Sequence, residues 1–394
     1  VGIGTLLEDG LGDTVRVSLT EEPEYEAPVA IALVNRYARR PNYALAEAPQ
    51  PIIRPHITVE TNAFIGGTLV PRVVVDLSGQ NLKDPTVLAT VGYRYDPLFD
   101  KYHMGEQSVD FVYLADTLPS FTMPGNLKQL FNHRTWLTIT DRTNIHPVFT
   151  LEEFVQAEIR DPFLNLVRMQ RQDLNTSLFE TMPLDSSVVF VVETKESHGM
   201  ADQRLFFSAL NELGLTNPVI IRRHYPPAEF SGPVGDLMSP EEPLSKLQLY
   251  AATDMGSLLV DGMGNGVWID APTIAPERLL STSFGILQAT RSRISKTEYI
   301  SCPSCGRTLF DLQETTQLIR SRTNHLKGLK IAIMGCIVNG PGEMADADYG
   351  YVGAGPGKVT LYRGKETVKR NVNSADALDE LINIIREDGR WIDP

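Results

Sequence analysis

The feature that most constrains this 394-residue chain is an internal repeat whose two copies lie 252 residues apart. The copies are TLLEDGLGDTVRVS (residues 5–18) and SLLVDGMGNGVWID (residues 257–270). Their identical positions are Leu6/Leu258, Leu7/Leu259, Asp9/Asp261, Gly10/Gly262, Gly12/Gly264 and Val15/Val267. A separation of about 250 residues is the length of one (β/α)8 barrel. The middle of the chain is therefore predicted to be a barrel whose last strand is at 267–270. The N-terminal copy is predicted to be the end of a first barrel, the rest of which is not in this sequence.

Between the two copies, predicted strands alternate with predicted helices, which is typical of α/β domains. Strands are expected at residues 73–77, 111–115, 136–140, 188–192 and 219–222, and helices at 151–158 and 202–213. In the first copy, a strand is expected at 14–19 and a helix at 25–39.

Four carboxylates stand at or just after predicted strand ends: Asp76, Asp116, Asp141 and Glu193. Catalytic carboxylates of barrels occupy such positions, so a metal-dependent site in this barrel is one interpretation. The four are scattered singly, without a paired His or Lys motif. Capping of loop ends is therefore the favoured interpretation.

The three cysteines of the chain lie near its end, as a C-x-x-C pair (Cys302, Cys305) and Cys336, with Glu343 following in a Gly/Pro-rich turn. A structural zinc site usually closes with four Cys or His ligands, and no fourth cysteine exists. Three thiolates suit a [4Fe–4S] cluster that leaves one iron for another ligand. A carboxylate is a hard ligand for that soft site and is therefore exchangeable. Zinc held by three thiolates and a carboxylate, or a cysteine pair that only packs, stays open at this point.

The region around the cysteines is predicted to be a smaller α+β domain. We expect a helix at residues 308–325, a buried strand at 330–334 that delivers Cys336 into its turn, a hairpin at 359–369 and a closing amphipathic helix at 375–386.

Two long motifs resemble one family. YISCPSCGRTLFD (residues 299–311) and IAIMGCIVNGPGEMADAD (331–348) are similar to the iron–sulfur domain of the 4-hydroxy-3-methylbut-2-enyl diphosphate synthases, as are GYVG (350–353) and GRWIDP (389–394). The resemblance implies that Cys302, Cys305, Cys336 and Glu343 hold a [4Fe–4S] cluster. It also implies that Asn339 is an active-site asparagine.

The resemblance further implies an oxidoreductase that opens 2-C-methyl-D-erythritol 2,4-cyclodiphosphate reductively in isoprenoid biosynthesis. Ferredoxin or flavodoxin is the implied electron donor, and the bacterial cytoplasm or plastid stroma the implied location. Arg16 and Ser18 match diphosphate contacts of the family's first barrel, a role that suits a cation and a hydroxyl beside a Gly-rich loop. In the second copy Trp268 and Asp270 replace them, so this barrel is expected to have lost diphosphate binding.

These observations give an α/β chain of three parts: the end of a first substrate barrel (1–34), a barrel-like spacer (35–283) and a cluster domain (284–394). Residues 284–394 carry a net charge of +2 within a chain of net charge −13, which places the last boundary. The negative total argues against nucleic-acid binding, and no apolar run is long enough for a membrane span. Without the first barrel the chain is expected to be inactive alone. A non-enzymatic electron carrier or zinc-binding scaffold is the alternative.

Overall fold

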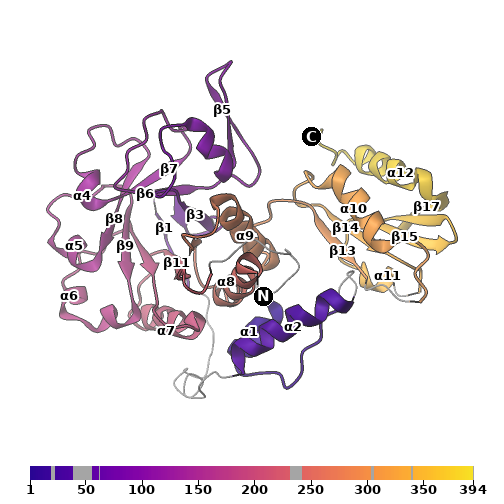
Figure 1. Ribbon diagram of the computed structural model, residues 1–394, viewed down its shortest axis with the longest axis horizontal. Helices are drawn as coiled ribbons and strands as arrows, with labels where there is room; N and C mark the ends of the chain where they lie inside the picture. The colour runs from indigo at the N-terminus through magenta and orange to yellow at the C-terminus, as the bar shows by residue number, and fades with distance from the viewer. Residues whose placement is uncertain are drawn as a thin grey trace. The chain divides into compact units, whose positions relative to one another are not determined.

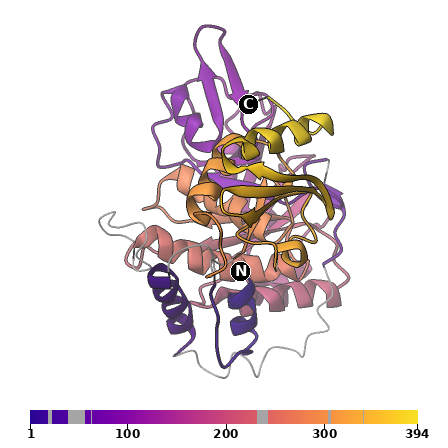
Figure 2. The same ribbon diagram turned by 90° about the vertical axis from the view of Figure 1, so that its right-hand side faces the viewer.

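The computed structural model describes residues 1–18, 23–38, 56–61, 63–230, 242–302, 306–338 and 340–393. The chain divides into two compact units. The first comprises Val1–Asp13 and Leu33–Arg293, and the second comprises Thr14–Ala32 and Ile294–Pro394. The first unit contains a barrel and the second a mixed sheet (Figures 1 and 2).

Eight parallel strands close the barrel in the order β3-β6-β7-β8-β9-β10-β11-β12. Their bounds are β3 Arg72–Asp76, β6 Phe111–Ala115, β7 Lys128–Asn132, β8 Ile145–Thr150, β9 Asn165–Met169, β10 Val188–Val192, β11 Val219–His224 and β12 Gly266–Asp270. Closure is made by β12 against β3, where Val267 pairs with Val73 and Trp268 with Val74. The predicted α/β barrel, with its last strand at the second repeat copy, is confirmed.

Strand β10 shows how the barrel is packed. Its sequence is Val-Val-Phe-Val-Val, and all five residues are buried. Phe190 contributes to the apolar layer between strands and helices, while Val189 and Val191 contribute to the barrel interior. A strand that is covered on both faces has a continuous apolar sequence, which is why the strand at 188–192 could be predicted. The interior is closed by side chains such as Trp268 and is a packed core.

The first unit contains further helices besides the barrel strands, and its α2 is divided between the two units. They are α1 Gly2–Glu8, α2 Pro23–Tyr37 (shared with the second unit), η1 Pro85–Val91, α4 His133–Trp136, α5 Leu151–Gln156, η2 Arg171–Asn175, α6 Ser177–Glu180, α7 Gly199–Glu212, α8 Pro243–Val260 and α9 Pro276–Ala289. Two antiparallel hairpins are β1 Glu60–Thr61 with β2 Ile65–Gly66, and β4 Tyr93–Asp96 with β5 Lys101–Met104, which extends from the barrel (Figure 1).

One predicted strand is wrong. Residues 136–140 were expected to pair in the sheet, but α4 ends at Trp136 and a turn follows. The indole of Trp136 is buried and donates to the Ile145 carbonyl at 3.2 Å, and the Arg142 guanidinium covers its ring. The apolar and β-branched composition therefore serves a packed turn, and the sheet position is taken by β7 just before it.

The two repeat copies pack directly on each other through α1 and α8. The hydroxyls of Thr5 and Ser257, which are equivalent in the repeat, lie 2.9 Å apart. Arg204 of α7 forms ion pairs with both Asp9 and Asp261, another equivalent pair. Equivalent residues that meet across a contact indicate a nearly two-fold arrangement of the two copies.

Glycines allow this close approach in a reciprocal way. A Cβ on Gly4 would lie 2.5 Å from the Thr253 hydroxyl, and a Cβ on Gly256 would lie 2.7 Å from a Val1 methyl group. Gly4 is equivalent to Gly256, and Val1 to Thr253. The glycine that directly precedes each copy thus receives the residue that lies four positions before the start of the other copy.

The second unit is built on a five-stranded sheet in the order β13-β14-β15-β16-β17. Its elements are β13 Glu298–Ser301, α10 Leu312–Thr323, β14 Lys330–Met334, α11 Gly340–Glu343, β15 Tyr349–Gly355, β16 Lys358–Arg363, β17 Glu366–Asn373 and α12 Ser374–Glu387. The first three strands are parallel and the last three antiparallel. Alternation along β14 sends Ile331 and Ile333 toward α10 and α12, and Met334 toward Met344 on the opposite face. The predicted α+β domain is confirmed.

Candidate functional site

The described cysteines lie at one edge of the mixed sheet. Strands β13 and β14 pair in parallel, with Ser301 opposite Ile333. Cys302 directly follows β13, and Cys336 follows β14 after one glycine. Because parallel strands end at the same edge of a sheet, both thiols are delivered there.

Gly335 connects the two cysteine segments. Its N–H donates to the sulfur of Cys302 at 3.3 Å, and its carbonyl accepts the N–H of Leu309 at 3.0 Å. The chain that leaves the first cysteine pair is therefore held against the residue that precedes the third cysteine.

Close packing makes glycine necessary at this junction. A Cβ on Gly335 would lie 2.7 Å from the Thr308 methyl group, and a Cβ on Gly353 of β15 would lie 2.4 Å from the Gly335 carbonyl oxygen. Real Cβ atoms essentially never come so close to other heavy atoms. Two glycines on adjacent strands thus let the backbones approach beside the thiols.

Burial differs between the predicted ligands. Cys302 is half-buried and packs against both apolar clusters of the unit, and Cys336 is half-buried as well. Glu343, the last residue of α11, is exposed. Ile337 and Val338, which follow Cys336, are also exposed. The two described thiols of the predicted ligand set stand at the edge of the core, and the predicted carboxylate ligand faces solvent.

Part of the predicted ligand set lies outside the described residues, namely Cys305 and Asn339. Within the described residues, no group of three His, Cys, Asp or Glu side chains is arranged to hold a metal ion. The third thiolate cannot enter that comparison, so the four-ligand set stays a prediction. The two thiols present, on neighbouring strand ends with an N–H donor on one sulfur, fit a thiolate-ligated cluster in donor type.

The predicted substrate contacts lie in irregular chain. Arg16 is exposed and Ser18 is half-buried. The strand expected at 14–19 is wrong over residues 14–18, for which no ladder partner occurs among the described residues. A strand needs such partners to form. The binding role of both residues stays a prediction.

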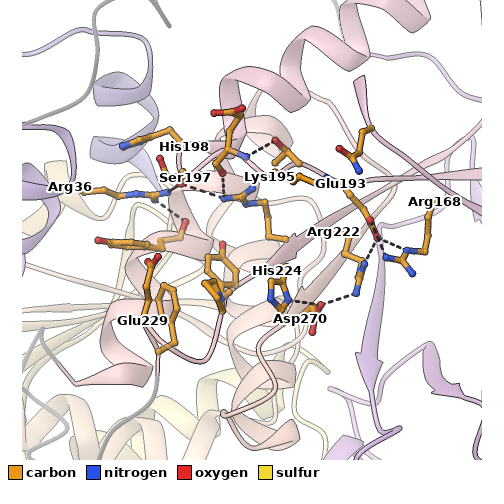
Figure 3. A pocket seen from close by; sticks show the side chains of 18 residues that line it. Arg36, Arg168, Glu193, Lys195, Ser197, His198, Arg222, His224, Glu229 and Asp270 are labelled. Carbon is orange, nitrogen blue, oxygen red and sulfur yellow. Dashed lines mark hydrogen bonds and ion pairs between the residues drawn. The ribbon is translucent and has the colours of Figure 1, made fainter. Parts of the chain in front are cut away.

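A second polar site fills the mouth of the barrel (Figure 3). It is a cavity of about 690 Å³ lined by residues at and after the carboxyl ends of β9, β10, β11 and β12. Glu193 accepts two hydrogen bonds from the Arg168 guanidinium, at 2.6 and 3.2 Å, and pairs with Arg222. Arg222 also reaches Asp270 at 2.7 Å, and Asp270 accepts from His224 at 2.8 Å. Burial would raise the pKa of Glu193, but the two arginines outweigh it and lower this pKa.

A deeper ion cluster centres on Asp254 of α8, whose side chain is fully buried. Its carboxylate pairs with Arg36 at 2.6 Å and with Arg223 at 3.2 Å, and accepts from the Tyr225 hydroxyl at 3.0 Å. Desolvation opposes ionisation of Asp254, yet the two arginines lower its pKa. Burying one carboxylate with two guanidiniums is tolerable only because each group is paired.

The mouth also shows what replaced the predicted diphosphate contacts of the first copy. Trp268, at the position of Arg16, is buried in the barrel with the Arg222 guanidinium over its ring, 4.7 Å from the centroid. Asp270, at the position of Ser18, is neutralised by Arg222. The second copy therefore offers an indole and a paired carboxylate where the first offers a cation and a hydroxyl.

Sequence reasoning missed Arg168, Arg222 and the role of Glu193 as their shared partner. Strand alternation in β11 carried a signal, since Arg222 lies two residues after the interior Ile220. The capping interpretation is confirmed for two of the four predicted carboxylates: Asp76 accepts the Ser78 N–H at 2.8 Å and Asp141 the Thr143 N–H at 3.0 Å. It is wrong for Glu193, which pairs with arginines, and for Asp116, which accepts from the side chains of Asn132 and Thr135.

The chain is similar to known proteins along its whole length. A family model described as the GcpE protein C-terminal domain matches residues 298–387. The chain is 40% identical to the 4-hydroxy-3-methylbut-2-en-1-yl diphosphate synthase (flavodoxin) of Parabacteroides distasonis, over 100% of this chain and 59% of that protein. Proteins of the same name from Phocaeicola vulgatus (36% identity, 99% and 59% coverage) and Leptospira interrogans (37%, 100% and 61%) are also similar.

The chain thus spans about three-fifths of the length of the curated relatives it matches. Within the part that the structure describes, none of the helices combines the length and the hydrophobicity needed to cross a membrane. The two motifs around the cysteines lie at the strand ends where the structure brings Cys302 and Cys336 together. Over its whole length the chain is similar to proteins named 4-hydroxy-3-methylbut-2-en-1-yl diphosphate synthase (flavodoxin), and its residues 298–387 match the GcpE protein C-terminal domain.

Proposed function

We propose that this chain is the iron–sulfur portion of an enzyme that reductively opens 2-C-methyl-D-erythritol 2,4-cyclodiphosphate to 4-hydroxy-3-methylbut-2-enyl diphosphate. The carrying observation is the delivery of Cys302 and Cys336 to one sheet edge, joined through Gly335. The names of the relatives give the reaction product and flavodoxin, which makes flavodoxin the favoured donor over ferredoxin.

In this proposal Cys302, Cys305, Cys336 and Glu343 hold a [4Fe–4S] cluster. When bound, such a cluster supplies single electrons and a Lewis-acidic iron for an oxygen ligand. The half-buried thiols anchor the site to the sheet edge. Glu343 is exposed on a four-residue helix, so its carboxylate can move away with little loss of packing. Asn339, four residues earlier in the sequence, would form a hydrogen bond with the substrate.

The barrel, predicted to span residues 35–283, is proposed to serve as a structural spacer. In the structure its compact unit continues through α9 to Arg293. Its mouth presents arginines, but Arg168 and Arg222 are already neutralised by Glu193 and Asp270. A diphosphate would have to displace these carboxylates, and Asp270 would repel it. Substrate binding is assigned instead to a first barrel, to which Arg16 and Ser18 would contribute.

Anaerobic reconstitution with iron and sulfide tests the cofactor. We expect about four irons and four sulfides per chain, with broad visible absorbance, the stoichiometry of a [4Fe–4S] cluster. Cys302→Ser is the matched control, and it should lose the absorbance. Stoichiometric zinc with no iron uptake would contradict the proposal and favour a zinc scaffold.

Turnover is tested separately by supplying the N-terminal part of the Parabacteroides distasonis relative together with reconstituted chain and reduced flavodoxin. Ring opening that requires both parts is the expected result. A stable cluster that gives no turnover with either reduced flavodoxin or reduced ferredoxin would favour the electron-carrier alternative.

A further inference from the structure

We propose that the backbone amide of Gly335 is a positioning donor to the Cys302 sulfur, and that it raises the reduction potential of the bound cluster. The inference rests on the proposed cluster and adds a residue that is not one of its ligands. It is carried by the N–H···S contact of 3.3 Å between strand ends that are 33 residues apart in sequence.

The direction of the bond decides its effect. An N–H donor stabilises negative charge on a thiolate, and reduction adds one negative charge to the cluster and its ligands. The bond is therefore worth more in the reduced state than in the oxidised state. Hydrogen bonds to cluster sulfurs are among the known determinants of cluster potentials.

The local packing fixes this donor before any cluster binds. The Leu309 N–H holds the Gly335 carbonyl, the Thr308 side chain lies against the Cα, and Gly353 abuts the carbonyl from the next strand. Gly335 also follows β14 directly, so its amide continues a paired strand. A donor held from several sides needs no reorganisation when charge arrives, which is the condition for a strong electrostatic effect.

Gly353→Ala is the test because it removes neither the N–H donor nor a predicted ligand, and acts on the donor only by displacing it. Its Cβ would lie 2.4 Å from the Gly335 oxygen and must displace the Gly335 backbone. Gly355→Ala is the matched control on the same strand, since a Cβ there would meet no described heavy atom within 4 Å. Neither glycine has a positive φ, so alanine is compatible with the backbone at both sites.

The midpoint potential of the reconstituted chain is measured by anaerobic redox titration followed by EPR. We expect Gly353→Ala to shift the potential to more negative values, and Gly355→Ala to match the unsubstituted chain. Iron and sulfide content are determined in parallel, so that cluster loss and a shifted potential are separate results. Equal potentials in all three proteins at equal cluster content would overturn the inference.

A second measurement needs no variant. In the reduced cluster of the unsubstituted chain, labelled with 15N-glycine, ENDOR spectra in H2O and D2O should show an exchangeable proton and a 15N coupling from a glycine amide. If Gly353→Ala does not fold, absence of these couplings would still overturn the inference. Failure of the unsubstituted chain to bind any iron would instead overturn the proposed cluster itself.

Discussion

The barrel mouth and the cysteine edge of the mixed sheet are both formed at the carboxyl ends of parallel strands, yet they treat their polar groups in opposite ways. At the mouth, Glu193 pairs with Arg168 and Arg222, and Asp270 pairs with Arg222. The Arg222 side chain is largely buried, whereas that of Arg168 is partly exposed. At the cysteine edge, the thiols are half-buried and the Glu343 carboxylate faces solvent.

The difference shows what a strand end can be used for. Charges that neutralise each other stabilise the barrel but present no net attraction to an anionic ligand. The Cys302 sulfur, which accepts a backbone N–H, is suited to the proposed cofactor. Position in an α/β fold therefore marks where a site can form, and under the proposed function the cysteine edge, not the paired mouth, carries the chemistry.

The sharpest test of the cysteine edge compares its predicted thiolate and carboxylate ligands. Cys336→Ser should abolish cluster assembly, because only two thiolates remain. Glu343→Ala should keep most of the iron, because three thiolates remain, although its cluster should degrade more easily to a three-iron form. Iron content and visible absorbance after anaerobic reconstitution measure both. If Glu343→Ala loses the cluster as completely as Cys336→Ser, the carboxylate is a structural ligand and the exchange mechanism loses its support.

The saturated side of the comparison is tested at Asp254. Asp254→Asn removes the carboxylate with which the buried guanidiniums of Arg36 and Arg223 both pair. Loss of one partner of a buried ion pair costs about 3–5 kcal/mol. Chemical denaturation should show the barrel destabilised by that amount, with iron content per folded chain unchanged.

Asp379→Ala is the control for Asp254→Asn, because its pair with Arg322 spans 3.5 Å and is largely exposed. Exposed pairs contribute about 0–1 kcal/mol, so this variant should behave almost like the unsubstituted chain. Equal effects of the two substitutions would mean that burial of the Asp254 cluster has no energetic role.

Acid should weaken the barrel in a defined direction. In the folded chain, the pKa values of Glu193 and Asp254 lie below the ordinary values of these groups, which are 4.5 and 3.8. The unfolded chain therefore takes up protons first as the pH falls, and stability declines from about pH 4.5 downward. Thermal unfolding of the cluster-free chain between pH 7 and pH 3 measures this. Glu193→Gln should reduce the slope, and an unchanged slope would exclude Glu193 as a contributor.

The smallest expected effect is the heat of diphosphate binding at the barrel mouth. Calorimetric titration of the whole chain with inorganic pyrophosphate should give no saturable binding that depends on Arg222. Arg222→Met and Arg16→Met separate the two possible locations. Micromolar binding that is abolished by Arg222→Met would show that the paired mouth still accepts diphosphate.

Much of the fold could be predicted because it depends on local patterns. The buried run of β10 and the repeat predicted the barrel, and the strand at 330–334 matches β14. Strand β8 was missed because Pro147 interrupts its pattern, a residue that usually argues against a central strand.

The candidate sites also differed in how far the sequence predicted them. The cysteines were found from their spacing, and the structure adds the junction at Gly335, whose partner Cys302 is 33 residues distant. The Arg168–Glu193–Arg222 network was not predicted, since its members lie 25 and 29 residues apart on different strands. No short motif encodes such contacts, because only closure of the sheet brings the residues together.

The reciprocal contact between α1 and α8 limits how the two repeat copies can diverge. Each glycine packs against a side chain on the opposite side of the contact, so a larger residue at Gly4 or Gly256 would clash with that side chain. Arg204 belongs to neither copy yet pairs with Asp9 and Asp261 together. The segments beyond this contact differ between the copies, with Arg16 and Ser18 in irregular chain and Trp268 and Asp270 at the end of β12. The helices that touch are sterically coupled, because a larger residue at a glycine of one copy requires a smaller side chain at the facing position of the other.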